Sequence, residues 1–195
     1  METKKNFYRV VLFLTIFSAL LFMPDGQRAA EARNSRAWRE RLSARTGTLW
    51  IEGQSLGDGI VLNARGELNV TWLERGLGRA LETDKNVAEW VVSGLGYYHS
   101  SRRETRDKLR GRDVLVLNYR AVKNWSFDPA ELTVDGYTIT PDDILTRKEY
   151  WERELAPGRS GTVAVAAPSL KPGQTVELRY ENSITQLEVP HSRAR

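Results

Sequence analysis

The stretch Asp113-Val114-Leu115-Val116-Leu117-Asn118-Tyr119-Arg120-Ala121-Val122-Lys123 is the most informative part of this sequence about its fold. Its first half is apolar at four successive positions, Val114 to Leu117. Because successive side chains of an extended chain point to opposite faces, both faces of a strand would be apolar here. A strand covered on both faces lies inside a layered protein. We therefore expect this stretch to form a central strand.

Strand signals surround it. Leu132-Thr133-Val134 and Tyr137-Thr138-Ile139 flank Asp135-Gly136, a pair that favours a tight hairpin because both turn positions need positive φ. Residues 67–83 fit either a strand or a helix, and we favour a strand through Leu73 followed by a loop or short helix. Other short apolar runs bounded by turn residues lie at residues 49–51, 60–62, 87–92, 162–166, 176–180 and 184–189. About eight or nine short strands predict an all-β fold, an Ig-like antiparallel β-sandwich.

Residues 1–32 have the three-part form of an export signal. Lys4, Lys5 and Arg9 precede an apolar run from Val10 to Met23, and Ala30-Glu31-Ala32 supplies the small residues that a signal peptidase accepts. The run is shorter than the roughly 20 residues that a membrane-spanning helix needs. We expect cleavage near Ala32 and a periplasmic or secreted product. The alternative is an uncleaved N-terminal membrane anchor.

The rest of the chain divides into three parts. Residues 33–45 form a short helical or disordered lead, in which Trp38 and Leu42 would share one helix face. The β-sandwich domain is predicted to cover residues 46–190, and residues 191–195 form a tail.

The composition excludes several function classes. The chain has no cysteine and two histidines, which removes thiol nucleophiles, zinc–thiolate sites and iron–sulfur clusters. The formal net charge of +4 falls to about +3 without residues 1–32, which is too small to argue for nucleic-acid binding. Loop spacings typical of nucleotide or calcium sites are missing from the sequence. We expect a non-enzymatic protein with no cofactor, no metal and no nucleic-acid partner.

One stretch concentrates positive charge. Its six cations fall within eleven residues: Arg102, Arg103, Arg106, Lys108, Arg110 and Arg112. Such a concentration could bind an envelope protein or an anionic surface, such as a lipid headgroup or a polyanionic saccharide. The alternative is a flexible loop that its charge keeps soluble.

Tryptophan and tyrosine suggest a second interpretation, carbohydrate binding or carbohydrate chemistry. Trp125, at a strand corner, and Tyr150 and Trp151, in a charged loop, are candidates to face a ligand, because Trp and Tyr suit half-buried surfaces. Trp50, Trp72 and Trp90 lie in apolar strand patterns and are predicted core residues. Nearby carboxylates could assist carbohydrate chemistry, although the arginines interleaved with them favour a salt-bridged loop. The carboxylates are Asp128, Asp135, Asp142, Asp143, Glu149, Glu152 and Glu154.

The order of several motifs resembles a known family. Trp90 to Gly94 is followed by the central strand, by Val122-Lys123-Asn124-Trp125-Ser126, by the Asp135-Gly136 turn and by Leu155-Ala156-Pro157-Gly158. With a strand that ends at Pro168, this order resembles the telokin-like immunoglobulin-fold domains of exported bacterial proteins, which have a V-x-N-x-S corner and an L-x-P-G turn. The similarity covers residues 86–190, and residues 46–85 have no counterpart in it. It implies an Ig-like fold and an exported protein of a family largely of unknown function. The expected role is a non-enzymatic binding or accessory module of the cell envelope.

Overall fold

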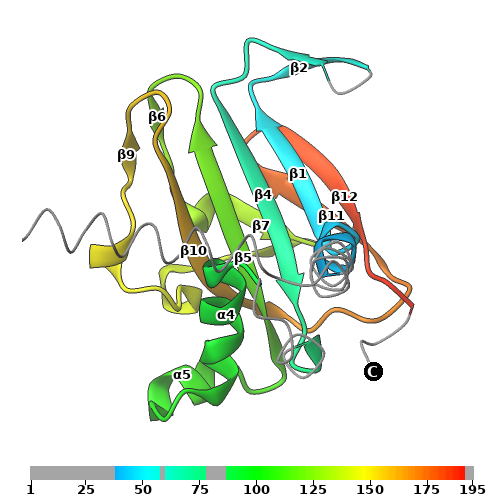
Figure 1. The fold of residues 1–195 in the computed structure, drawn as a ribbon, viewed down its shortest axis with the longest axis vertical. Helices are drawn as coiled ribbons and strands as arrows, with labels where there is room; N and C mark the ends of the chain where they lie inside the picture. The colour runs from blue at the N-terminus through cyan, green and yellow to red at the C-terminus, as the bar shows by residue number, and fades with distance from the viewer. Residues whose placement is uncertain (1–37, 58–59, 78–86, 192–195) are drawn as a thin grey trace, which may run out of the picture. The chain divides into compact units, whose positions relative to one another are not determined.

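Two four-stranded antiparallel sheets form the framework (Figure 1). The first has the order β1 (Thr46–Ile51), β4 (Gly66–Leu73), β5 (Arg112–Ala121), β10 (Ser160–Pro168). The second has the order β12 (Ser183–Glu188), β11 (Thr175–Tyr180), β7 (Leu132–Val134), β8 (Tyr137–Thr138). Two small ribbons pair β2 (Gln54–Gly57) with β3 (Ile60–Leu62) and β6 (Trp125–Ser126) with β9 (Glu154–Leu155). The predicted all-β antiparallel sandwich is confirmed.

This computed structural model describes residues 38–57, 60–77 and 87–191. The expected export signal at residues 1–32 and most of the expected tail lie outside the described residues. A helix at residues 38–43 opens the described part, and its Trp38 and Leu42 are both buried against the domain, as the spacing predicted. No helix in the described ranges is long and apolar enough to cross a membrane.

The central position of β5 is also confirmed. It pairs with β4 on one side and β10 on the other, so that Leu115 lies between Trp72 and Val165. The whole run from Val114 to Leu117 is fully buried. The predicted hairpin forms as well, because β7 and β8 are joined at Asp135 and Gly136, whose φ angles are 49° and 82°.

Large aromatic rings fill the space between the sheets. Tyr119 stacks on Phe127 with ring centroids 4.0 Å apart, and Trp125 meets Phe127 and Tyr180 edge-on. Gly66 makes room for the indole, because a Cβ at this position would lie 2.4 Å from the Trp125 ring. The core therefore includes Trp125, which the sequence placed at the surface.

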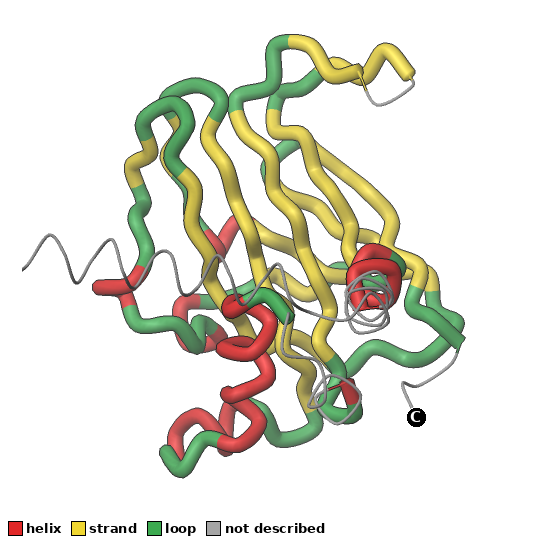
Figure 2. Tube along the Cα trace, viewed as in Figure 1, coloured by secondary structure: helices red, strands yellow, loops and turns green. Residues whose placement is uncertain are grey.

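A helix covers part of the outer face of the first sheet. α4 (Glu89–Gly96) lies in front of that sheet in Figures 1 and 2, while the second sheet lies behind it. Val91 and Leu95 of α4 pack with Leu73, Val114 and Val116 in a second hydrophobic cluster.

The prediction of a strand at residues 87–92 is wrong, since residues 89–92 form the first turn of α4. The helix approaches closely because Gly94 has no side chain, and a Cβ there would lie 2.6 Å from Leu73 and 2.7 Å from Val116. Trp90 is consequently half-buried on a helix, and Trp50 is half-buried on β1, whereas Trp72 is a core residue as predicted. The other short helices within the described ranges are α5 (Arg103–Lys108), η1 (Tyr97–His99), η2 (Pro129–Glu131), η3 (Pro141–Asp143) and η4 (Lys148–Tyr150).

Candidate functional site

The three predicted ligand-facing aromatic residues do not form one surface. Trp125 is 2% exposed in the core, so its predicted role is wrong. Trp151 is half-buried and packs edge-on against Phe127 with ring centroids 6.2 Å apart. Tyr150, at 70% exposure, is open to solvent. A carbohydrate site built on these three residues is therefore not supported.

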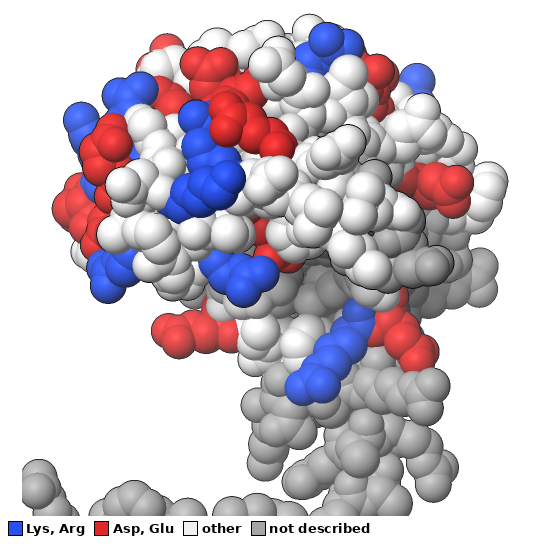
Figure 3. Space-filling view, turned by 90° about the horizontal axis from the view of Figure 1, so that it is seen from above, with Lys and Arg blue, Asp and Glu red and all other residues white. Residues whose placement is uncertain are grey.

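The carboxylates between residues 128 and 154 are largely engaged by neighbouring arginines. Asp128 pairs with Arg153, and Glu152 pairs with Arg159 at 2.7 Å. Figure 3 views the end of the molecule that is at the top of Figure 1, and positive and negative side chains alternate over it. Within the described ranges, no group of three or more acidic or histidine side chains could hold a metal ion. The loop is salt-bridged, as its interleaved charges indicated.

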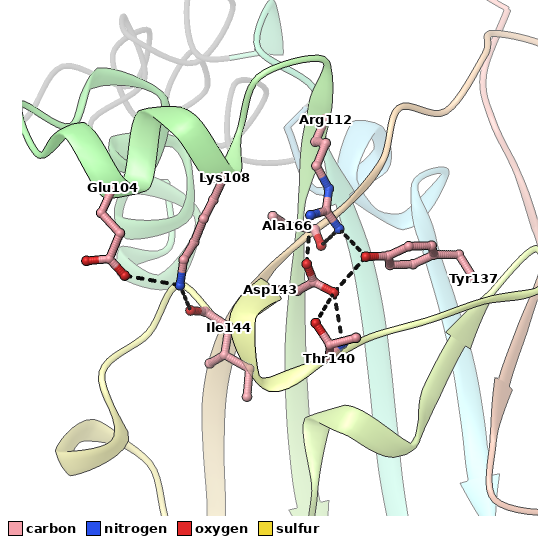
Figure 4. Close-up of polar contacts among 8 residues, drawn as sticks. All are labelled: Glu104, Lys108, Arg112, Tyr137, Thr140, Asp143, Ile144 and Ala166. Atoms are coloured by element: carbon pink, nitrogen blue, oxygen red, sulfur yellow. Dashed lines mark hydrogen bonds and ion pairs between the residues drawn. The ribbon is translucent and has the colours of Figure 1, made fainter.

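The basic stretch divides into two sets of residues. Arg103 and Arg110 expose 90% and 87% of their side chains, and Arg102 and Arg106 are also exposed. Lys108 is half-buried, and its ammonium group contacts Glu104 at 3.3 Å and the carbonyl oxygen of Ile144 at 3.5 Å (Figure 4). Residues 103–108 of the stretch form the helix α5.

Arg112 is not a surface cation, contrary to the prediction. Its guanidinium group donates to Asp143 Oδ1 at 2.7 Å, to the Tyr137 hydroxyl at 3.0 Å and to the carbonyl oxygen of Ala166 at 2.8 Å (Figure 4). Asp143 is 4% exposed, and its other oxygen accepts from the backbone N–H and the hydroxyl of Thr140. These contacts tie η3 to the start of β5, so Arg112 supports the fold.

Opposing effects act on the Asp143 carboxyl. Burial raises its pKa, but the hydrogen bonds from Arg112, the Thr140 backbone and the Tyr137 hydroxyl outweigh burial and leave the pKa below its ordinary value. The carboxylate is therefore charged at neutral pH and remains paired with Arg112.

The exposed arginines surround a hollow together with a residue distant in sequence. Arg75, from the turn after β4, joins Arg103, Arg106 and Arg110 around a hollow of about 580 Å³, which Tyr97 and Tyr98 also line. We call these six residues the arginine cup. Arg102 is exposed next to α5 but does not line the hollow. One acidic side chain lies among the four arginines, since Asp107 is 3.7 Å from Arg103 and 3.9 Å from Arg110. The cup keeps an excess of positive charge.

Tyr98 gives the cup a rigid wall. Its hydroxyl donates to the carbonyl oxygen of Leu73 at 2.5 Å and accepts from the backbone N–H of Val114 at 2.8 Å. Burial, followed by the charge of Asp113, raises the pKa of this hydroxyl far above its usual value. The Arg75 guanidinium carbon lies 5.3 Å from the centre of the Tyr98 ring, a distance at which a cation is attracted to the ring face. The neutral, anchored ring positions Arg75 in the cup.

A second hollow contains residues that the sequence analysis did not single out as functional. It lies on the outer face of the first sheet, between the helix at residues 38–43 and α4, and Trp38, Trp90, Asn69, Asn118 and Thr162 are among its lining residues. The polar alternation of β4, β5 and β10 was the available signal, but the pairing of these strands cannot be read from the sequence.

Comparison of the chain with protein families, curated proteins and solved structures found no significant match. The resemblance to telokin-like domains therefore stays a prediction, and function must be argued from the geometry of the chain itself.

Proposed function

We propose that this protein is an exported, non-enzymatic binding module of the cell envelope, and that the arginine cup binds a phosphate-type anionic group of its partner. The observation that carries the proposal is the convergence of Arg75 with Arg103, Arg106 and Arg110 on one hollow. Arg75 lies 28 positions before Arg103 in the sequence, and it forms no ion pair with another described residue. Export rests on the three-part form of residues 1–32.

The charges of the cup suit an anion. A guanidinium group presents a planar fork of N–H donors that matches the oxygens of phosphate, and several such groups around one hollow strengthen the attraction. Asp107 offsets only part of this charge. Arg106 has no ion pair in the described part of the chain, so it can turn toward a bound anion without losing a partner.

The chemistry that the cup offers is that of binding. The Tyr98 hydroxyl is occupied by two backbone groups and has a strongly raised pKa, so it cannot act as a base near neutral pH. Guanidinium groups hold a charge and stay protonated. The cup can therefore hold and orient an anionic partner.

The test compares two triple variants with equal loss of charge. In the first, Arg103, Arg106 and Arg110 become glutamine. In the control, glutamine replaces Arg153, Arg159 and Arg179, which are also exposed but pair with carboxylates outside the cup. Binding is measured to vesicles with and without phosphatidylglycerol, to inorganic phosphate and to immobilised heparin.

We expect the cup variant to bind anionic vesicles at least about tenfold more weakly, and the control to stay within about twofold of the wild type. Added salt should weaken wild-type binding, because exposed charges are screened over about 8 Å at physiological ionic strength. Retention on heparin alone, without binding to phosphate or anionic vesicles, would overturn the assignment of a phosphate-type group. Equal losses in the two variants would show a nonspecific charge effect and overturn the proposal.

A further inference from the structure

The outer face of the first sheet is polar at the end that α4 leaves uncovered. The register places Thr48 opposite Asn69, Asn69 opposite Asn118, and Asn118 opposite Thr162. Because these positions alternate with core residues on every strand, the four side chains form one row across all four strands on the outer face. They are half-buried, unlike the apolar residues beneath α4.

Hydrogen bonds hold this row in place and leave part of its capacity unused. The Thr48 hydroxyl donates to Asn69 Oδ1 at 2.6 Å, and the Thr162 hydroxyl donates to Asn118 Oδ1 at 2.8 Å. Both hydroxyl oxygens keep lone pairs that can accept, and the Asn118 amide keeps two N–H donors with no partner in the described ranges. The row thus presents fixed donors and acceptors side by side.

Tryptophan side chains stand beside this row. Trp38 and Trp90 line a hollow of about 550 Å³ together with Asn69, Asn118 and Thr162. An adjoining hollow of about 620 Å³ shares Trp90 and Thr162 and is also lined by Tyr150. We call the two hollows together the sheet-face groove. Their volumes are within the ordinary range for small-molecule sites, about 300–1,000 Å³.

Charges in the groove largely cancel, because its two hollows are lined by two arginines, Arg39 and Arg120, and by two glutamates, Glu67 and Glu89. Arg120 makes a two-pronged contact with Glu67 Oε2, at 3.2 Å from Nε and 2.7 Å from Nη2. Glu67 also accepts from the Asn69 amide at 3.0 Å. Both members of the pair line the first hollow, so a charged ligand would find little net attraction at this pair. The groove therefore differs from the arginine cup, which has an excess of positive charge.

We infer that the sheet-face groove binds a neutral saccharide. A sugar ring has apolar C–H faces that can lie on Trp90, and hydroxyl groups that both donate and accept, as the Asn118 amide and the threonine hydroxyls require. A wholly apolar ligand would bury these polar groups unpaired, at a cost. An extended peptide gains most from pairing with a sheet edge, whereas this row lies on a sheet face. This inference does not depend on the proposed function of the arginine cup. Of the three residues predicted to face a carbohydrate, Tyr150 alone is among the lining residues given for the groove.

The test measures binding of neutral hexasaccharides of glucose, xylose and N-acetylglucosamine to the purified protein. Tryptophan fluorescence and ligand-observed NMR report binding, and thermal melting reports folding. Asn118→Ala removes the unpaired amide, and Trp90→Ala removes the ring. Their controls are Thr133→Ala, a half-buried polar residue of the second sheet, and Trp151→Ala, a half-buried tryptophan outside the groove.

We expect at least one hexasaccharide to bind, and Trp90→Ala to abolish binding. Asn118→Ala should weaken binding about tenfold and lower the melting temperature by only a few degrees, because it also removes the hydrogen bond from Thr162. Both controls and the triple glutamine variant of the cup should bind as the wild type does, with little dependence on salt. Failure of every hexasaccharide to bind the wild type overturns the inference. Undiminished binding in Asn118→Ala overturns it too, even if Trp90→Ala unfolds.

Discussion

The two faces of the sheet β1-β4-β5-β10 come from the same four strands but differ in what covers them. The inner face packs along its whole length against the second sheet, through residues such as Leu115, Leu117 and Val163. The outer face is apolar where α4 and the helix at residues 38–43 pack in its hydrophobic cluster, and elsewhere it carries Asn118, Thr162 and their polar neighbours. The inner face therefore supplies the packing between the two sheets, and the outer face keeps polar side chains available for binding.

The largest expected difference between the faces concerns an added charge. Leu115→Asp should prevent folding, because it buries an unpaired carboxylate between two sheets. Ser160→Asp on the exposed outer end of β10 should change the free energy of unfolding by about 0.5 kcal/mol or less. Circular dichroism and urea denaturation measure both. A Leu115→Asp protein that melts like the wild type would contradict the central position of β5.

A second contrast compares two tryptophans. Trp125→Ala should lower the free energy of unfolding by about 3–5 kcal/mol, since it empties a fully packed site in the core. Trp90→Ala, on the half-buried outer side, should cost less than half of that. Denaturant titrations of the two variants give the comparison. Equal losses would mean that the outer face contributes as much packing as the inner face.

The smallest effect concerns the polar contacts at the start of β5. Asp143→Asn should cost about 2 kcal/mol at pH 7, because it removes the charge from the hydrogen bonds with Arg112. The folded protein holds the pKa of Asp143 below its ordinary value, so this stabilisation is present above pH of about 4 and is lost as the pH falls through the folded-state pKa.

Unfolding free energies measured from pH 7 down to pH 3 check this prediction. The variant should lose less stability on acidification than the wild type. The plots of unfolding free energy against pH for the two proteins should therefore converge at low pH. Parallel curves over that range would show that Asp143 does not contribute through its charge.

The helix α4 shows where local sequence patterns stop being sufficient. Val87 to Val92 has the short apolar run of a strand, and glycines at positions 94 and 96 weaken a helix by about 1 kcal/mol each. The chain is helical there because Gly94 allows close packing on Leu73 and Val116. That packing depends on β4 and β5 being neighbours, which no local pattern contains.

The basic stretch teaches the same lesson about charge. The sequence gave no reason to treat its six cations differently, because their spacing does not show which of them are exposed and which make structural contacts. In the folded chain Arg112 and Lys108 hold structural contacts, while Arg75, which the sequence analysis did not select, completes the cup. Membership of the site depends on contacts between residues far apart in the chain.

Local chemistry was enough to locate most strands, the Asp135-Gly136 hairpin and the buried run of β5, because side-chain alternation and turn conformation depend on adjacent residues. Strand pairing and register arose from long-range packing. That packing aligned Thr48, Asn69, Asn118 and Thr162 in one row, moved Trp125 into the core beside Gly66, and brought Arg75 to α5. Both candidate binding surfaces consist of such distant residues, so they exist only once the sheets have formed.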